Sequence, residues 1–427
     1  MAALKSYKKR WYILSVFVYY TFINTIQMTA YSSITEIVAR YYNVSHFSVN
    51  WTSLIYMVLY PVLVVPASYI IEKKGLRVAC LCGCLGTAIG TGIKVFSIER
   101  YRFWVVMLGQ AFTASAIVLI MCLPPKIASV WFRPSEASMA CSLGSLGANL
   151  GNAFGYLLAV SVVPDSKDPA DIQGGVKFLS WILTTLMIPV SLAVIFYFPA
   201  KPPEAEQTPD GNTGTNSSFS WKSIKWSKAF LLHTSAYAIN IGVFSTLIIL
   251  LSEFVNVHFE SAAEDAGRMG FCLLVFGVVG CVGFGFYLDK THRYKESCIF
   301  LFASTAVCII ALTVALQESS LIASYIFCSI LGIVINPYIP VGFEFGIELT
   351  YPSDEGTVAG FLFATSQIAS SVFGICVAQI NSYAGSVASL GTLVALMVVG
   401  TVIQALVPNK LKRQKSRLVG CQNEGKC

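Results

Sequence analysis

Polar and aromatic side chains recur inside long apolar stretches of the chain, where a neutral amide can bind a ligand. If these stretches cross a membrane, such side chains are costly to bury and mark functional sites. Residues 24, 28 and 31 share one face at helical spacing. The predicted substrate-binding set is Asn24, Gln27, Met28, Tyr31, Asn149, Asn240, Phe244, Ser245 and Gln367. The alternative interpretation is that the amides only hydrogen-bond neighbouring helices to each other.

The charge of these stretches limits the ligands that they can hold. No Lys, Arg or Asp lies at mid-depth in the stretches that carry the set. A cavity lined by neutral amides and rings suits a neutral or cationic substrate and disfavours sugar phosphates and dicarboxylates, which pair with basic side chains. Aromatic faces can hold a quaternary ammonium ion without a counter-ion. The alternative is that the rings only pack between helices.

Acidic residues with trailing basic residues follow two apolar stretches at matched positions. The later copy reads Gly285-Phe-Tyr-Leu-Asp289, and the earlier one reads Ser68-x-x-x-Glu72-Lys-Lys-Gly75-Leu-Arg77. A small residue lets helices approach closely, and a carboxylate can accept from a helix N-terminus. We predict that these turns take part in gating; an ordinary charged turn is the alternative. The predicted gating set is Glu72, Gly75, Arg77, Gly285, Asp289, Arg293 and Glu344.

Two prolines interrupt the apolar stretch 321–346. Pro337 and Pro340 are predicted to break the helix, because proline lacks the amide donor and restricts the preceding residue. Glu344 and Glu348 share a helical face at i,i+4. We expect Glu348 to be solvated near the cytosolic end. Glu344 is deeper and is interpreted as a gate or a proton site, with a structural pairing as the alternative.

Enzymatic and metal-binding patterns are missing from the sequence. It has no Gly-x-Ser-x-Gly, His-Glu-x-x-His or Walker motif, and its 13 cysteines form no Cys-x-x-Cys pair. Cys80, Cys82 and Cys84 alternate within an apolar run, which favours small buried hydrophobes over a metal site. His233 is expected to be hydrogen-bonded or solvated rather than a haem ligand. We therefore expect no catalytic residue, no metal site and no cofactor.

The composition places all of these residues in a membrane protein. Hydrophobic residues make up 55% of the 427-residue chain and charged residues 12%, about half the usual share of a soluble protein. This excludes soluble enzymes and nucleic-acid binders, although the net charge is +7. The fold class predicted is an all-α membrane protein with twelve transmembrane helices. The twelve stretches are 11–36, 51–71, 78–97, 103–123, 137–163, 177–198, 229–252, 269–288, 297–316, 321–346, 356–381 and 386–407.

An internal repeat divides the twelve stretches into two sixes. Asn24 corresponds to Asn240, Glu72 to Asp289, and Phe154-Gly155 to Phe373-Gly374, at offsets that drift slowly from 216 to 219. Two parallel six-helix repeats describe the major facilitator architecture, in which substrate binds near the bilayer midplane and one half rocks against the other. The predicted domains are a first bundle at 1–198, a disordered cytosolic linker at 199–226, a second bundle at 227–407 and a basic cytosolic tail at 408–427.

Basic residues set the orientation. Most Lys and Arg fall in segments that are cytosolic when the N-terminus is cytosolic, which accounts for the positive charge without a polyanionic partner. Both termini are then cytosolic, and the sequon Asn43-Val-Ser45 lies outside, where Asn43 can be glycosylated. Asn50 begins a second outer sequon, too close to the membrane for use. We expect a monomeric multi-pass protein of the plasma membrane, with the lipid bilayer and a small molecule as its partners.

Several motifs along the chain resemble one family of facilitators. They include Trp51-x-Ser-Leu-Ile-Tyr56-Met, Gly75-Leu-Arg77, Phe103-Trp-Val-x-Met-Leu-Gly-Gln110, Gly342-Phe-Glu-Phe and Glu348-Leu-Thr-Tyr-Pro352. They are similar to those of the feline leukaemia virus subgroup C receptor-related family. The matches run from the first stretch to the eleventh. The resemblance implies transport of choline and ethanolamine, or of haem.

The resemblance also implies a ligand site, an aromatic cage with two glutamines. The glutamine of the eleventh stretch is kept as Gln367, and that of the fifth falls on Asn149. The cage tryptophan falls on Met28 and the cage tyrosine on Ser245, so both cage aromatics are replaced. The leading hypothesis is a transporter of a small organic cation or amphiphile that works by alternating access without ATP. The alternatives are haem transport on the same scaffold and a membrane receptor that does not transport.

Overall fold

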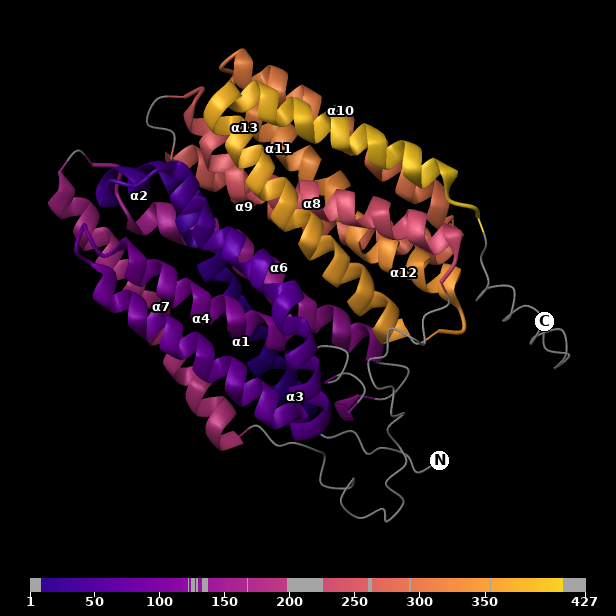
Figure 1. The fold of residues 1–427 in the computed structure, drawn as a ribbon, viewed down its shortest axis with the longest axis horizontal. Coiled ribbons are helices and arrows are strands. Elements are labelled where there is room, and N and C mark those ends of the chain that lie inside the picture. Colours follow the sequence, from indigo (N-terminus) through magenta and orange to yellow (C-terminus); the bar gives the residue numbers. More distant parts are fainter. Residues whose placement is uncertain are drawn as a thin grey trace, which may run out of the picture. The chain divides into compact units, whose positions relative to one another are not determined.

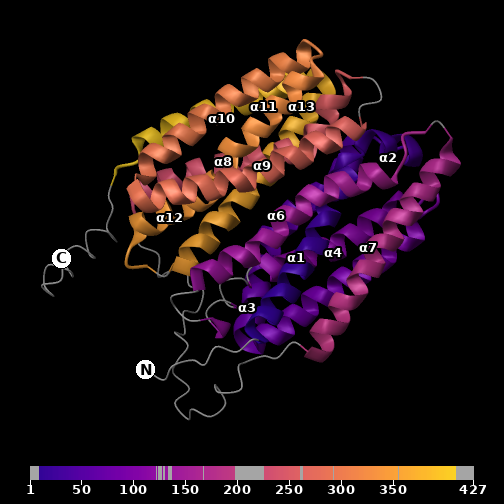
Figure 2. The same ribbon diagram turned by 180° about the vertical axis from the view of Figure 1, so that it is seen from behind.

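The computed structural model describes residues 9–409, except for 122, 124–126, 128–129, 133–136, 167, 198–225, 260–262, 292 and 354. The predicted linker, apart from Trp226, and almost all of the predicted tail lie outside this part of the chain. Within it, the structure is helical (Figures 1 and 2).

The helices fall into two compact units. The first unit is Met1–Asn216 together with Ile249–Phe271, and the second is Ser217–Ile248 together with Cys272–Cys427. The end of α8 and the start of α9 therefore belong to the first unit. The helices up to the divide are α1 (Lys9–Ser33), α2 (Thr35–Tyr42), α3 (His46–Lys94), the 3₁₀ turn η1 (Val95–Ser97), α4 (Phe103–Met121), α6 (Ala137–Val162) and α7 (Pro169–Tyr197). Those that follow are α8 (Lys228–Asn256), α9 (Ala263–Thr291), α10 (Tyr294–Gln317), α11 (Leu321–Ile335), α12 (Tyr338–Thr350) and α13 (Glu355–Leu406).

Each of the twelve predicted stretches contains an apolar helix. Ten helical segments of the described chain are long and apolar enough to cross a membrane. The segment Thr357–Leu406 spans twice, because Gly385 leaves the helical conformation at φ 84° and ψ 176°. The apolar part of α6, Leu146–Val162, supplies the remaining span.

Two left-handed glycines turn the chain between consecutive spans. Gly75 has φ 82° and ψ 175°, almost the same conformation as Gly385, and lies at the start of the second of the two spans of α3, His46–Ile71 and Lys73–Ser97. Only glycine adopts this conformation without strain, because it has no Cβ. The predicted break at the prolines is also present, since α11 ends at Ile335 and α12 begins at Tyr338.

Glycine and threonine bring α1 and α6 together in the first unit. A Cβ added at Gly151 would lie 2.1 Å from Thr25 Oγ1 and 2.3 Å from the Phe22 carbonyl oxygen. Gly147 and Gly155, one turn to either side, face Thr21 and Thr29 in the same way. Small residues at this spacing are typical of closely packed transmembrane helices.

The second unit uses the same kind of packing between α9 and α11. A Cβ on Gly332 would lie 2.0 Å from the Leu273 carbonyl oxygen, and one on Gly280 would lie 2.3 Å from that of Ile333. Gly277 makes room for Asn336, the residue that begins the α11–α12 break.

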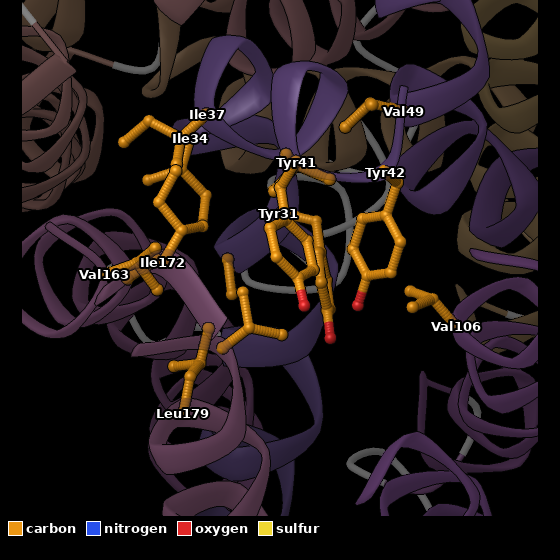
Figure 3. Packing of buried hydrophobic residues seen from close by; sticks show 14 of the residues in the cluster. Tyr31, Ile34, Ile37, Tyr41, Tyr42, Val49, Val106, Val163, Ile172 and Leu179 are labelled. Atoms are coloured by element: carbon orange, nitrogen blue, oxygen red, sulfur yellow. The ribbon is translucent and has the colours of Figure 1, made fainter. Parts of the chain in front are cut away.

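A buried aromatic and aliphatic cluster closes one end of the first unit (Figure 3). The predicted first span ends at Ser33 and continues, after a break at Ile34, as the short helix α2. Tyr42 of α2 donates its hydroxyl proton to the Ser97 carbonyl oxygen at 3.0 Å, at the end of the third span. Burial raises the pKa of the Tyr42 phenol above its ordinary value, so it stays a neutral donor.

Candidate functional site

Met28 and Asn149 lie on the two helices of the glycine–threonine seam. Thr25 Oγ1 donates to the Ala148 carbonyl oxygen at 3.0 Å, and Thr29 Oγ1 donates to that of Asn152 at 2.9 Å. These bonds fix the register of α1 against α6 on either side of the candidate pair. Both Met28 and Asn149 are partly exposed. Their side chains are thus held on rigid helices and remain accessible.

Asn24 is turned to a different set of helices. It is fully buried and donates Nδ2 to Thr87 Oγ1 at 2.8 Å and to the Thr113 carbonyl oxygen at 3.4 Å. Tyr20 reaches the same Thr87 hydroxyl at 3.4 Å. This geometry matches the alternative interpretation of the amides, in which they join helices, because the donor is used within the protein.

A buried lysine that the sequence-based set omitted lies next to Gln27. Lys94, at the end of the third span, is 2% exposed and donates Nζ to Gln27 Oε1 and, at 2.9 Å, to Gln110 Oε1. The ammonium also lies 5.7 Å from the ring centroid of Tyr31. In the described part of the chain no carboxylate forms a salt bridge with it. Two predicted site residues, Gln27 and Tyr31, are thus brought together by a cation that we did not predict.

Gln110 connects this lysine to three further segments. Its Nε2 donates to the Gln27 carbonyl oxygen at 2.9 Å and to that of Thr52 at 3.2 Å. Its Oε1 accepts from Lys94 and, at 3.3 Å, from the Tyr56 hydroxyl. The amide therefore joins α1 and α4 to both spans of α3.

In the second unit, α8 and α13 bring Ser245 close to the helical turn that carries Gln367. Ser370 Oγ donates to Ser245 Oγ at 3.3 Å, and Gln367 lies three residues before Ser370. Ser245 and Gln367 are both partly exposed, whereas Phe244 is 7% exposed. The two cage positions of this unit thus lie close to one another and remain accessible.

Asn240 is the most deeply buried member of the predicted set in the second unit. It has no exposed surface, and neither Oδ1 nor Nδ2 has a hydrogen-bond partner among the described residues. Tyr237, one turn before it, has a buried hydroxyl that is unpaired in the same sense. The hydrogen-bonding capacity of this face of α8 is therefore unused in this conformation.

His233 was expected to be either hydrogen-bonded or solvated. It is buried and hydrogen-bonded. Its Nε2 lies 2.8 Å from the Gly342 carbonyl oxygen, and its Nδ1 lies 3.2 Å from Gln404 Oε1. Both facing oxygens only accept, and a neutral imidazole has a single N–H, so Nε2 donates its proton to Gly342 and Nδ1 has none to donate to Gln404. Tyr338 donates to the same Gln404 oxygen at 3.3 Å. The histidine thus joins α8 to α12 and α13.

The predicted gating residues have unequal surroundings. Gly75 forms the turn described above, and Arg77 donates to the Ile195 carbonyl oxygen of the last turn of α7 at 3.2 Å. An added Cβ at Gly285 meets no described atom within 4 Å, so the close helix approach expected there is not found. Arg293 forms an exposed ion pair with Glu296 at 3.5 Å. The side chains of Glu72 and Asp289 lie outside the described set.

The two glutamates of α12 correct a prediction. Glu348, expected to be solvated, is only 3% exposed, whereas Glu344, four residues earlier, is exposed. The position of a residue along an apolar stretch measures depth in the membrane. It does not give the side of the helix that faces protein. Both residues have interaction partners, so neither is a free carboxylate.

The sequons that begin at Asn43 and Asn50 differ in accessibility. Asn43 is exposed, at the C-cap of α2 in the left-handed conformation with φ 53° and ψ 48°. Asn50 is 1% exposed and donates Nδ2 to Glu253 Oε1 at 2.8 Å. The second sequon is thus blocked by a hydrogen bond as well as by its position.

Among the described residues, no group of three His, Cys, Asp or Glu is arranged to hold a metal ion. A shallow, mostly apolar hollow of about 250 Å³ lies between the third span and α7 and contains none of the predicted site residues. Its lining is Ala88, Thr91, Thr184, Met187, Ile188, Ser191 and Leu192.

Comparison with known proteins identifies the family of this helical scaffold. Residues 16–374 match the family model of the Major Facilitator Superfamily. The chain belongs to this superfamily. It is also 33% identical over 422 residues to the choline/ethanolamine transporter flvcr2a of Danio rerio, a match that covers 97% of this chain and 90% of the relative. The human choline/ethanolamine transporter FLVCR2 is 30% identical over 434 residues, covering 99% and 82%. Within the superfamily, the chain is therefore a member of the FLVCR family of transporters.

Solved structures of other facilitators share the fold. A D-xylose–proton symporter matches with a TM-score of 0.77 at 11% identity, covering 95% of this chain and 99% of the other. A bacterial homologue of the human lysosomal transporter Spinster, inward-facing and unoccupied, matches with a TM-score of 0.73 at 16% identity, covering 96% and 98%. At these identities the likeness establishes the facilitator fold only.

In this FLVCR-family member, the predicted set separates by burial. The four positions carried over from the family's cage, Met28, Asn149, Ser245 and Gln367, are all partly exposed, whereas Asn24, Gln27, Tyr31, Asn240 and Phe244 are buried. Sequence reasoning missed Lys94 because it lies at the end of an apolar stretch, where a lysine is expected to reach the interface. One signal was available: the chain continues with Ser97, so the lysine is not the last residue of its stretch.

Proposed function

We propose that this facilitator transports a small organic cation of the choline/ethanolamine class by alternating access, without ATP. The observation that carries the proposal is the identity of about one third, over nearly the whole chain, to transporters named for these substrates. The charge of the candidate positions supports it. All four partly exposed cage positions are neutral, and a cation needs no basic partner.

The proposed binding residues are Met28 and Asn149 in the first unit and Ser245 and Gln367 in the second. The amides of Asn149 and Gln367 supply hydrogen bonds to a substrate hydroxyl, and Met28 supplies a polarisable apolar contact. The buried members of the set, with Asn24 as the clearest case, support these positions rather than contact the ligand.

The deciding experiment is uptake and efflux of labelled choline, ethanolamine and haem, side by side, in cells that express the chain. Choline or ethanolamine flux above that of mock-transfected cells supports the proposal. Flux of haem alone transfers the assignment to haem. Surface expression without flux of any of the three favours a receptor that does not transport.

A variant pair tests the cage directly. Met28→Trp with Ser245→Tyr restores both aromatic rings of the family's cage. Each ring placed against a desolvated ammonium adds on the order of 1–2 kcal/mol, so choline affinity should rise about ten- to several-hundredfold. Choline binding to purified protein measures this change. If the double variant reaches the membrane without any gain in affinity, the ligand is not a quaternary amine held at this place.

We further propose that the acidic turn after the eighth span takes part in gating. Its residues are Gly285, Asp289 and Arg293, with Glu72, Gly75 and Arg77 at the matched turn of the first unit and Glu344 on α12. Asp289→Asn should change the ratio of inward- to outward-facing protein, measured by side-specific thiol labelling, more than it changes ligand affinity. Lost affinity with an unchanged labelling pattern would contradict this role.

We propose that the protein is a monomer of the plasma membrane. We further propose that both termini are cytosolic, because the basic residues gather on the side of the N-terminus. The facilitator class supports a protein that is not an enzyme and needs no cofactor for transport.

A further inference from the structure

The first unit contains a buried cation that the proposed transport site does not use. Lys94 is 2% exposed within a membrane-spanning helix, and the groups that face its Nζ are two amide oxygens and the Tyr31 ring. Neither α1 nor α4 places a carboxylate within ion-pair distance of it. Charging a buried lysine that has no counter-ion costs several kcal/mol, so a lysine kept inside a span is expected to have a function.

The side chain of Gln27 depends on this lysine. Its Oε1 accepts from Lys94, and its Nε2 has no hydrogen-bond partner among the described residues. The Gln27 carbonyl oxygen accepts from Gln110, the other amide that Lys94 contacts. Lys94 therefore holds the side chain of residue 27, and Gln110 holds its backbone.

The next residue along α1 is Met28, the partly exposed residue of the proposed site. Its carbonyl oxygen accepts a hydrogen bond from Ser53 Oγ. Two consecutive carbonyl groups in the C-terminal half of α1 thus accept side-chain hydrogen bonds from other spans. These two hydrogen bonds fix the rotation of α1 about its axis at the helical turn that carries Met28.

The neighbouring helices are shaped to admit the lysine. A Cβ added at Gly109 would lie 2.5 Å from Lys94 Cγ and 2.7 Å from the Gly90 carbonyl oxygen. The aliphatic part of the lysine side chain therefore fits between the two helices only because residue 109 of α4 is a glycine. It is part of the packing between the third and fourth spans.

We propose that Lys94 is a positioning residue of the transport site: through Gln27 and Gln110 it sets the rotation of α1 and hence the presentation of Met28. The inference rests on the proposed function only for the use of Met28 in binding. The presentation of Met28 can be measured without any substrate.

The primary test is the rate at which Met28→Cys reacts with a small thiol reagent in membranes, relative to the parent without that substitution. Lys94→Met keeps the apolar stem and removes the ammonium. Loss of a charge-assisted hydrogen bond releases Gln27, so the labelling rate should change by about tenfold. Lys177→Met, which removes an exposed lysine of α7 in the same unit, is the matched control and should leave the rate unchanged.

Variants of Gln27 keep the test informative if Lys94→Met does not reach the membrane. Gln27→Leu removes the acceptor and should change the labelling of Met28→Cys in the same direction as Lys94→Met. Gln27→Glu keeps an acceptor for the ammonium, so the labelling rate of Met28→Cys should stay at that of the protein with native Gln27. A lysine that only stabilises the fold would lower the yield of folded protein in these variants and leave the labelling of the folded fraction unchanged, which would overturn the proposal.

Transport kinetics separate this inference from the proposed function. If choline is carried, Lys94→Met should raise KM about tenfold and leave the maximal rate per surface molecule nearly unchanged. A labelling change without choline transport by the parent retains the positioning role and removes the substrate assignment. Choline transport with unchanged labelling and unchanged KM removes the positioning role alone.

Discussion

The amide side chains of this transporter divide into those whose hydrogen bonds are used within the protein and those that remain available. Gln110 donates both amide protons to backbone carbonyl groups and accepts from Lys94 and Tyr56. Gln367 is partly exposed on α13, and its backbone carbonyl accepts from Ser371. A ligand gains most from an amide whose partners are otherwise water, so Gln367 is a better candidate for substrate contact than Gln110.

Gln367→Ala should abolish choline uptake while surface expression stays at the parental level. The substitution removes the hydrogen-bonding group and little buried contact, so folding is largely preserved. Cell-surface biotinylation and labelled uptake measure the two quantities. Ser371→Ala is the matched control, because it removes a hydroxyl one turn further along the same helix and should retain uptake. Equal uptake by Gln367→Ala and the parent would leave the glutamine a structural residue.

Residue types could be predicted from the sequence better than residue partners. Asn43 and the neutral candidate set are readable along the chain. Lys94 bonds two glutamines, Gln27 and Gln110, which are 67 and 16 residues away along the chain. No local sequence pattern connects the three residues. Glu348 was placed in solvent because depth was inferred from sequence position. Which face of a helix meets protein depends on neighbours contributed by distant segments.

At the scale of elements, the membrane spans and the proline break were predictable from the sequence. The contacts between neighbouring helices were only partly predictable. Length and apolarity predict a helix for each stretch, and proline chemistry predicts the break before Tyr338. The first stretch was predicted to run to residue 36, but α1 ends at Ser33. The sequence has no glycine or proline at this position that would indicate the end. The glycines of α6 were visible in the sequence, but the threonines opposite them on α1 were not assigned a role.

The seam between α1 and α6 predicts a large effect for a single methyl group. Gly151→Ala places Cβ against the Phe22 carbonyl oxygen, a backbone atom that yields only if the helices separate. We expect a loss of about 1–3 kcal/mol in stability, seen as a lower melting temperature in detergent. Gly174→Ala in α7, where an added Cβ meets nothing within 4 Å, should leave the melting temperature unchanged or raise it. Equal melting temperatures for the two variants would show that the seam tolerates separation.

At the scale of the whole molecule, the orientation of the chain in the membrane can be tested at one residue. If the α2–α3 connection is outside, Asn43 carries a glycan. Asn43→Gln should then remove the shift in electrophoretic mobility that glycosidase treatment also removes. Asn50→Gln is the internal comparison and should keep the shift, because Asn50 is bonded to Glu253. A glycosidase-sensitive shift that persists in Asn43→Gln would place the glycan elsewhere.

The polar character of α1 has a consequence for how the protein is made. α1 is the least apolar of the ten long spans and also one of the most enclosed, with 67% of its most apolar window buried. Thr25 and Thr29 find their acceptors on α6, 123 residues later in the chain. A ribosome that has just released α1 has not yet synthesised those partners. Until α6 is made, the Thr25 hydroxyl can bond only carbonyl groups of its own helix, and the α1–α6 hydrogen bonds of Thr25 and Thr29 cannot form. Substitutions of these threonines should therefore affect the yield of inserted protein during synthesis before they affect the stability of the finished fold.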